Sequence, residues 1–153
     1  MLLGKPEALR AAVPDGARLI GVDLGSKTLG LALSDTGWVI ASPLETLRRG
    51  KFRADAERFF SLVDKHGVGG LVIGLPINMD GSEGPRCQST RAFVANLLAL
   101  RDLPLLLWDE RLSTQAVNRV LIDEADVSRR RRGALVDKLV AAYILQGVLD
   151  SLR

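Results

Sequence analysis

The chain has 153 residues, of which 47% are hydrophobic, and this is the size of one domain with a single core. One cysteine and one histidine exclude disulfides, Cys/His zinc sites and a histidine-based catalytic triad, so any bound metal would have oxygen ligands. The net charge of +3 is modest, but four arginines form one run, which is typical of a polyanionic partner or of solvated surface. No apolar run approaches the ~20 residues that span a bilayer, and the first residues lack the apolar segment of a signal peptide, so we expect a cytoplasmic protein without membrane contact.

The first half of the chain predicts an antiparallel meander. Residues 5–12 fit a short helix within an N-terminal extension, residues 1–17. Strands are then expected at 18–24, at 29–34 and around 38–41, because short apolar stretches are separated by glycine-containing turns.

Asp23 is the unexpected residue of the first of these strands. A carboxylate stands there between Gly21 and Gly25, where a hydrocarbon side chain would be expected. An unpaired polar group in an apolar interior costs roughly 2–7 kcal/mol, so a cation, a metal or a hydrogen-bond donor should accompany it. Gly21 would clear the face that carries Asp23 and leave space for ions and a phosphate backbone. The alternative is an aspartate at a strand end that only bonds the following turn.

The second half of the chain predicts strand–helix units. The expected elements are a helix at 51–65, a strand at 68–73, a helix that Pro85 opens, a strand at 104–108, a helix capped by Ser113 or Thr114, and a final helix at roughly 132–152. Together with the meander they predict one α/β domain over residues 1–153. Its mixed five-stranded sheet would have three antiparallel and two parallel strands, flanked by helices.

This topology brings two further carboxylates toward Asp23. Glu110 follows the strand at 104–108, and the carboxyl ends of parallel strands meet at one edge of a sheet, so Glu110 and Asp23 should be neighbours. On the final helix, Asp137 lies on the apolar stripe that includes Val140. The alternative for Asp137 is an acid in the first turn of a helix, which the helix dipole stabilises by ~0.3–1 kcal/mol.

Carboxylates in such a cluster would repel one another and raise each other's pKa unless divalent cations were bound. Oxygen ligands favour the hard ions Mg²⁺ and Mn²⁺. Two such ions about 3.5–4 Å apart activate a water on one side of a phosphodiester and stabilise the leaving oxygen on the other. We therefore predict Asp23, Glu110 and Asp137 as catalytic and metal-binding residues in phosphodiester hydrolysis.

Basic residues are candidates for nucleic-acid contacts. Arg129, Arg130, Arg131 and Arg132 form the arginine run, which precedes the final helix and could hold phosphates in a salt-dependent way. Lys27, in the turn after Asp23, is a second candidate. Exposed, solvated surface is the alternative interpretation for both.

Four segments resemble, in order, the signatures of the YqgF/RuvX family. They are residues 21–27, 74–86, 109–114 and 136–142. Each segment is short, but four in the right order across residues 19–150 form a specific pattern. The chain departs from the family at Thr28-Leu29, where Arg-Ile is usual, and so has one positive charge fewer in that turn.

The resemblance implies a ribonuclease H-like fold and a divalent-metal-dependent nuclease, with Asp23, Glu110 and Asp137 as its acidic metal-binding triad. The implied role is maturation of the 5′ end of small-subunit ribosomal RNA in bacteria, with cleavage of Holliday junctions or other DNA in some members. The partner would be structured RNA or branched DNA, and the protein could be a monomer or a homodimer.

Two rival functions fit the same features. One is a non-catalytic nucleic-acid-binding or ribosome-assembly factor on the same fold. The other is an actin-like or sugar-kinase ATPase, but that class needs two domains around its nucleotide, more than 153 residues hold.

Overall fold

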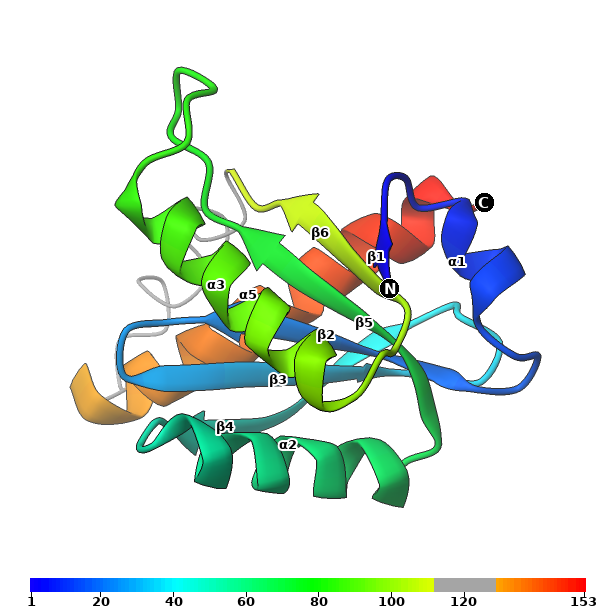
Figure 1. Cartoon of the computed structure of the whole chain (residues 1–153), viewed down its shortest axis with the longest axis horizontal. Helices are drawn as coiled ribbons and strands as arrows, with labels where there is room; N and C mark the ends of the chain where they lie inside the picture. The colour runs from blue at the N-terminus through cyan, green and yellow to red at the C-terminus, as the bar shows by residue number, and fades with distance from the viewer. Residues whose placement is uncertain (112–128) are drawn as a thin grey trace.

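The computed structural model describes residues 1–111 and 129–153, with the backbone alone at 129–134. One six-stranded sheet in the order β1-β6-β5-β2-β3-β4 has helices on both faces (Figure 1). No helix within the described ranges is long and apolar enough to cross a bilayer. The elements in chain order are β1 (Leu2–Leu3), α1 (Ala8–Ala12), β2 (Arg18–Leu24), β3 (Thr28–Ser34), β4 (Ala41–Arg48), α2 (Phe52–Lys65), β5 (Val68–Leu75), α3 (Pro85–Leu100), β6 (Leu105–Asp109) and α5 (Arg129–Ser151).

Strands β2, β3 and β4 form the predicted antiparallel meander. Strand β2 has the predicted bounds and pairs on its other side with β5 in parallel. Strand β5 is in turn parallel to β6, so the carboxyl ends of β2, β5 and β6 lie at one edge of the sheet. The topology expected from the strand–helix units is therefore confirmed.

Two details of the predicted sheet are wrong. The third meander strand covers Ala41–Arg48 rather than 38–41, because Trp38 has a φ of +57° and belongs to the turn before it. The indole Nε1 of Trp38 donates to the backbone oxygen of Ala17 at 2.8 Å, a tertiary contact that the sequence does not show. Residues 1–17 also supply β1, which pairs with β6 and makes the sheet six-stranded rather than five-stranded.

The described helices mostly follow the prediction. Helices α2 and α3 lie where they were expected, and Pro85 is the first residue of α3. Helix α5 begins at Arg129 rather than near residue 132, so the arginine run forms its first turn instead of a separating loop. The helix expected to begin near residue 113 lies outside the described residues.

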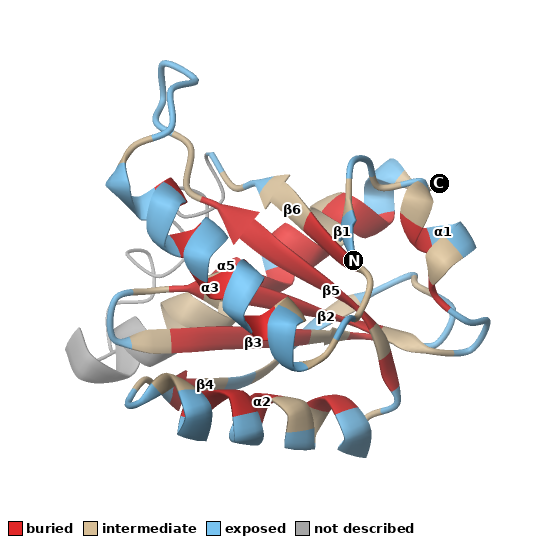
Figure 2. Cartoon of the chain, viewed as in Figure 1, coloured by how far each residue is buried: buried red, intermediate tan, exposed pale blue. Residues whose placement is uncertain are grey.

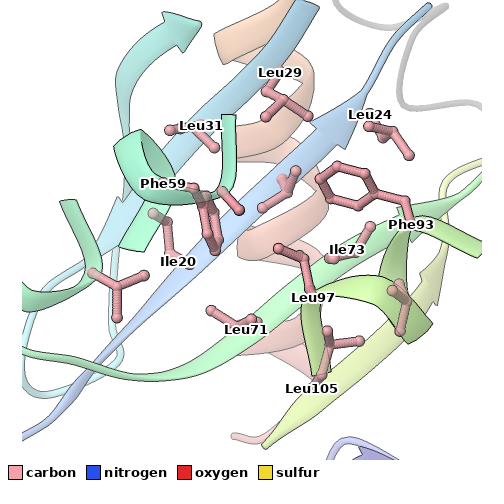
Figure 3. Packing of buried hydrophobic residues seen from close by; sticks show 14 of the residues in the cluster. Ile20, Leu24, Leu29, Leu31, Phe59, Leu71, Ile73, Phe93, Leu97 and Leu105 are labelled. Carbon is pink, nitrogen blue, oxygen red and sulfur yellow. The ribbon is translucent and has the colours of Figure 1, made fainter. Parts of the chain in front are cut away.

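Large side chains separate the sheet from α2 and α3. Phe59, Phe93 and Leu97 on these helices pack among buried leucines and isoleucines of the strands (Figure 3). The buried residues of the helices form stripes that face the sheet, while their outer sides are exposed (Figure 2). This face of the sheet is an ordinary hydrophobic core.

Helices α1 and α5 cover the opposite face, and α5 approaches the strands much more closely. A Cβ at Gly21 would lie 2.8 Å from the Cβ of Leu145, and one at Gly30 would lie 2.1 Å from the backbone oxygen of Asp137. The expectation that Gly21 leaves space for ions is therefore wrong, because α5 fills that space. The glycines instead bring α5, and with it Asp137, against the sheet.

Candidate functional site

Asp23 lies one residue before the end of β2, and its partner on β3 is Gly30, which α5 approaches. Burial raises the pKa of Asp23 to about 7. The charges of Glu110 and Asp137 add to this rise, and the charge of Arg86 opposes it. The predicted proximity of Asp23 to the other two acids is therefore present in the structure.

Glu110 follows β6 directly, and its backbone N–H donates to the backbone oxygen of Leu75 at 3.3 Å. Glycine at position 74 leaves room for this side chain, because a Cβ there would lie 2.3 Å from Oε2 of Glu110 and would displace it. That oxygen is buried and has no hydrogen-bond partner in the described part of the chain. Burial raises the pKa of Glu110. A buried carboxylate oxygen without a partner is a place where a cation or a proton is expected.

Asp137 lies more than two turns into α5, since that helix starts at Arg129 and has no acid in its first turn. The helix-dipole explanation of Asp137 is thereby excluded. The hydroxyl of Thr28, at the start of β3, donates to Oδ2 of Asp137 at 2.7 Å. Thr28 therefore orients this carboxylate, a role that sequence analysis missed because it noted Thr28 only as a departure from the family pattern.

The three side chains suit a divalent cation by their chemistry. Each offers carboxylate oxygens, and Oε2 of Glu110 lacks any other described partner. Asp23 is the electrostatic neighbour of both Glu110 and Asp137. Across residues 1–111 and 129–153, however, no three Asp, Glu, His or Cys side chains lie close enough together to share one ion. Bare carboxylates repel one another, which favours such a separation.

Arg86 is a site residue that the sequence analysis quoted but did not assign. It is the second residue of α3, and its positive charge lowers the pKa of both Asp23 and Glu110. Its side chain is exposed and forms no ion pair with any described residue. An arginine in the first turn of a helix has no distinguishing signal in one sequence, so only its place in the segment 74–86 could have identified it.

The predicted basic contacts lie on two different elements of the fold. Lys27 is exposed in the turn between β2 and β3, and its backbone oxygen accepts a hydrogen bond from the backbone N–H of Arg49 at 2.8 Å. The arginine run lies on α5, the helix that carries Asp137, but only its backbone is described. The nucleic-acid contacts of both remain predictions.

A family profile described as RuvX, Holliday junction resolvase, matches residues 17–151. A protein of Paramagnetospirillum magneticum is 62% identical over 146 residues, which is 95% of this chain and 94% of its own. A protein of Rhodospirillum rubrum is 59% identical over 141 residues, which is 92% of this chain and 88% of its own. Both are named as candidate pre-16S rRNA nucleases.

Solved structures of the fowlpox virus Holliday junction resolvase share the fold. The complex of that resolvase with junction DNA aligns with a TM-score of 0.54 at 10% identity, over 88% of this chain and 98% of the viral chain. The structure of the resolvase itself gives 0.50 at 11% identity, over 89% and 99%. The expected ribonuclease H-like α/β fold is confirmed.

Proposed function

The chain belongs to the RuvX family, and we propose that it is a divalent-metal-dependent nuclease that hydrolyses phosphodiester bonds in structured nucleic acid. Its principal substrate in this proposal is the 5′ end of the precursor of 16S ribosomal RNA, which matches the name of its relatives. The description of its family makes a four-way DNA junction the second substrate to consider. With either substrate, we expect the protein to act in the bacterial cytoplasm.

One observation carries the proposal: three acids from separate elements lie on one side of the sheet, where Glu110 and Asp137 act electrostatically on Asp23. Asp23 comes from β2, Glu110 follows β6 and Asp137 belongs to α5. Their mutual effect on the pKa of Asp23 and the unpaired oxygen of Glu110 make the cluster unfavourable without a counter-charge. Bare carboxylates repel a phosphate backbone, so this arrangement favours a cation-dependent nuclease over a fold that only binds nucleic acid.

Asp23, Glu110 and Asp137 would hold Mg²⁺ or Mn²⁺, because these ions prefer carboxylate oxygens. When bound, such ions supply Lewis-acid stabilisation of phosphate charge and lower the pKa of a water nucleophile. The residues themselves must first be deprotonated. Since the pKa of Asp23 is about 7 without a cation, we expect metal affinity to strengthen as the pH rises through about 7. Thr28 keeps Asp137 oriented throughout by its hydrogen bond.

The test compares cleavage of a precursor 16S rRNA fragment with cleavage of a four-way DNA junction by the same preparation, at low salt with Mg²⁺ or Mn²⁺. Asp23→Asn should abolish cleavage of the preferred substrate, while Asp15→Asn serves as the matched control. Asp15 is exposed in a turn before β2, so its replacement makes the same change of charge away from the acids.

Faster cleavage of the RNA supports the proposed principal substrate, and faster cleavage of the junction replaces it with branched DNA. Absence of cleavage of both substrates, or normal cleavage by Asp23→Asn, would refute the proposal that the protein is a nuclease with Asp23 in its active site. In that case the non-catalytic nucleic-acid-binding or assembly factor becomes the better account.

A further inference from the structure

A hollow of about 300 Å³ with a mixed lining, of which Leu24 is the apolar member, lies where the turn after β2, the residue following β4 and the first turns of α3 meet. The side chains and backbone that face it include Gly25, Ser26, Arg49, Arg86, Ser89 and Thr90. Two of these residues are arginines, three carry hydroxyl groups, and none is acidic. This lining suits an anion with several oxygen acceptors.

Arg49 is fixed in the wall of the hollow. Its Nη1 donates to the backbone oxygen of Gly25 at 2.6 Å, and its guanidinium lies 5.6 Å from the centre of the Phe93 ring. A guanidinium has five N–H donors in a rigid plane, so the bond to Gly25 orients the group and leaves further donors available. A cation that is already ordered loses little conformational entropy when it binds an anion.

Arg86 connects the hollow with the acids. It lines the hollow, and its charge also acts on Asp23 and Glu110. It has no ion-pair partner among the described residues, so a phosphate would be its counter-charge on the side away from the acids. The hollow therefore lies within the reach of one side chain from the predicted cleavage site.

From these contacts we propose that the hollow is a phosphate-binding subsite, which holds a phosphate of the substrate strand next to the phosphate that is cleaved. Arg49 and Arg86 bind the phosphate oxygens, and the hydroxyl of exposed Ser89 completes the subsite. The inference rests on the proposed function, because the strand in the hollow is the one that reaches the acids. It adds a positioning role: the filled hollow would fix which phosphodiester lies at Asp23.

Substitution of Ser89 tests the subsite with little risk to folding, because Ser89 is exposed on α3. Ser89→Glu places a negative charge in the hollow, and Ser61→Glu places the same charge on the exposed side of α2 as its control. The measurement is fluorescence anisotropy of a labelled single-stranded RNA in EDTA, so cleavage plays no part. We expect Ser89→Glu to weaken binding about tenfold or more and Ser61→Glu to change it less than about twofold.

Arg86→Gln gives a second variant, and Arg53→Gln is its control. Both arginines are the second residue of a helix and both are exposed. Loss of one phosphate contact should lower the slope of log Kd against log salt by about 0.7 for a single strand, in Arg86→Gln only. Equal effects of Ser89→Glu and Ser61→Glu, together with equal salt slopes for the two arginine variants, would overturn the inference.

RNAs that differ at their 5′ end distinguish the two possible sources of the bound phosphate, the backbone and the terminus. If the loss in Ser89→Glu is the same for RNA with a 5′-phosphate and with a 5′-hydroxyl, the hollow binds a backbone phosphodiester. If the loss requires the 5′-phosphate, the hollow binds the terminal phosphate. As a check without nucleic acid, inorganic phosphate should shift the amide resonances of residues 25 and 89 in the wild-type protein and leave both unchanged in Ser89→Glu.

Failure of this inference is distinct from failure of the proposed function. The subsite fails if the matched variants bind RNA alike, whatever happens to cleavage. The nuclease proposal fails if Asp23→Asn cleaves normally, whatever happens to binding in EDTA.

Discussion

The two faces of the sheet use opposite means to hold their helices. On one face, Phe59 of α2 and Phe93 of α3 keep the helices away from the strands by the volume of their side chains (Figure 3). On the other face, Gly21 and Gly30 let the backbone of α5 come into contact with the strands. Both arrangements bury apolar area, and the second also brings Asp137 against the strand that carries Gly30, the pairing partner of Asp23.

Both faces therefore stabilise the fold by hydrophobic burial, but only the α5 face also carries the acids. Hydrophobic burial stabilises the fold in proportion to area and tolerates small shifts of a helix. A metal site does not tolerate such shifts, because its ligands must meet within a few tenths of an ångström. The glycines are therefore found opposite α5, where the predicted ligands lie, and not opposite α2 or α3.

Among the variants considered, the largest effect on stability is expected on the face that α2 and α3 cover. Phe59 is 1% exposed, and Phe59→Ala should lower the free energy of unfolding by about 3–5 kcal/mol, measured by urea denaturation. The variant should still bind Mn²⁺ with wild-type affinity at low temperature, where it remains folded. A loss of Mn²⁺ affinity in the folded variant would show that packing on the α2/α3 face also determines the geometry of the acids.

Asp23→Asn should raise stability, since it removes a charge that the fold disfavours. The pKa of Asp23 is about 7 in the native state and about 4 in an unfolded chain. The native state thus keeps the proton of Asp23 to higher pH, so the contribution of Asp23 to wild-type stability falls as the pH rises from about 4 to about 7. In EDTA at pH 8, the variant should be more stable by on the order of 2–4 kcal/mol.

Below about pH 4 this gain should vanish, because Asp23 is then protonated in both states. Denaturation of both proteins across this pH range checks the expectation, with Asp15→Asn as the charge control. A constant difference between Asp23→Asn and the wild type at every pH would contradict the account.

Gly30→Ala tests the close approach of α5. The new methyl group would lie 2.1 Å from the backbone oxygen of Asp137, so α5 must move, at a cost of about 1–3 kcal/mol or more. Mn²⁺ affinity and cleavage should fall with it, since Asp137 moves away from Asp23. Gly4→Ala is the control, because no atom lies within 4 Å of its added methyl group. Unchanged Mn²⁺ affinity in Gly30→Ala would show that the close approach of α5 to β3 does not determine the geometry of the metal site.

The smallest effect is expected from the hydroxyl of Thr28. Thr28→Val removes the donor to Oδ2 of Asp137 and should cost about 1 kcal/mol of stability. Mn²⁺ affinity should weaken several-fold, and Thr28→Ser should restore it because the donor returns. If valine and serine gave the same affinity by calorimetry, the hydrogen bond would have no orienting role.

The sequence predicts most of the fold where local pattern and tertiary structure agree. Strand β2 has an apolar run that ends at Gly25, and Pro85 opens α3 as expected. The predictions are wrong where contacts between residues distant in sequence determine the local structure. Strand β1 has only two residues, Leu2–Leu3, and forms because it pairs with β6. Trp38 lies in a turn rather than in the predicted strand, and its indole N–H donates to the backbone oxygen of Ala17.

The site residues, too, could be predicted from the sequence only where local pattern or strand topology places them. Asp23 and Glu110 could be placed together, because parallel strands end at one edge of the sheet. The inward direction of Asp137 follows from helical periodicity. The roles of Thr28 and Arg86 could not be predicted, since each depends on a side chain brought near by tertiary packing rather than on neighbours in sequence.

The measurement that tests the central claim most directly is calorimetric titration of Mn²⁺ into the wild-type protein and into Asp23→Asn, Glu110→Gln, Asp137→Asn and Asp15→Asn. If the α5 face joins the three acids into one cation-binding centre, the first three variants each lose at least about tenfold in affinity, and Asp15→Asn binds like the wild type. Equal Mn²⁺ affinity in all five proteins would contradict the account.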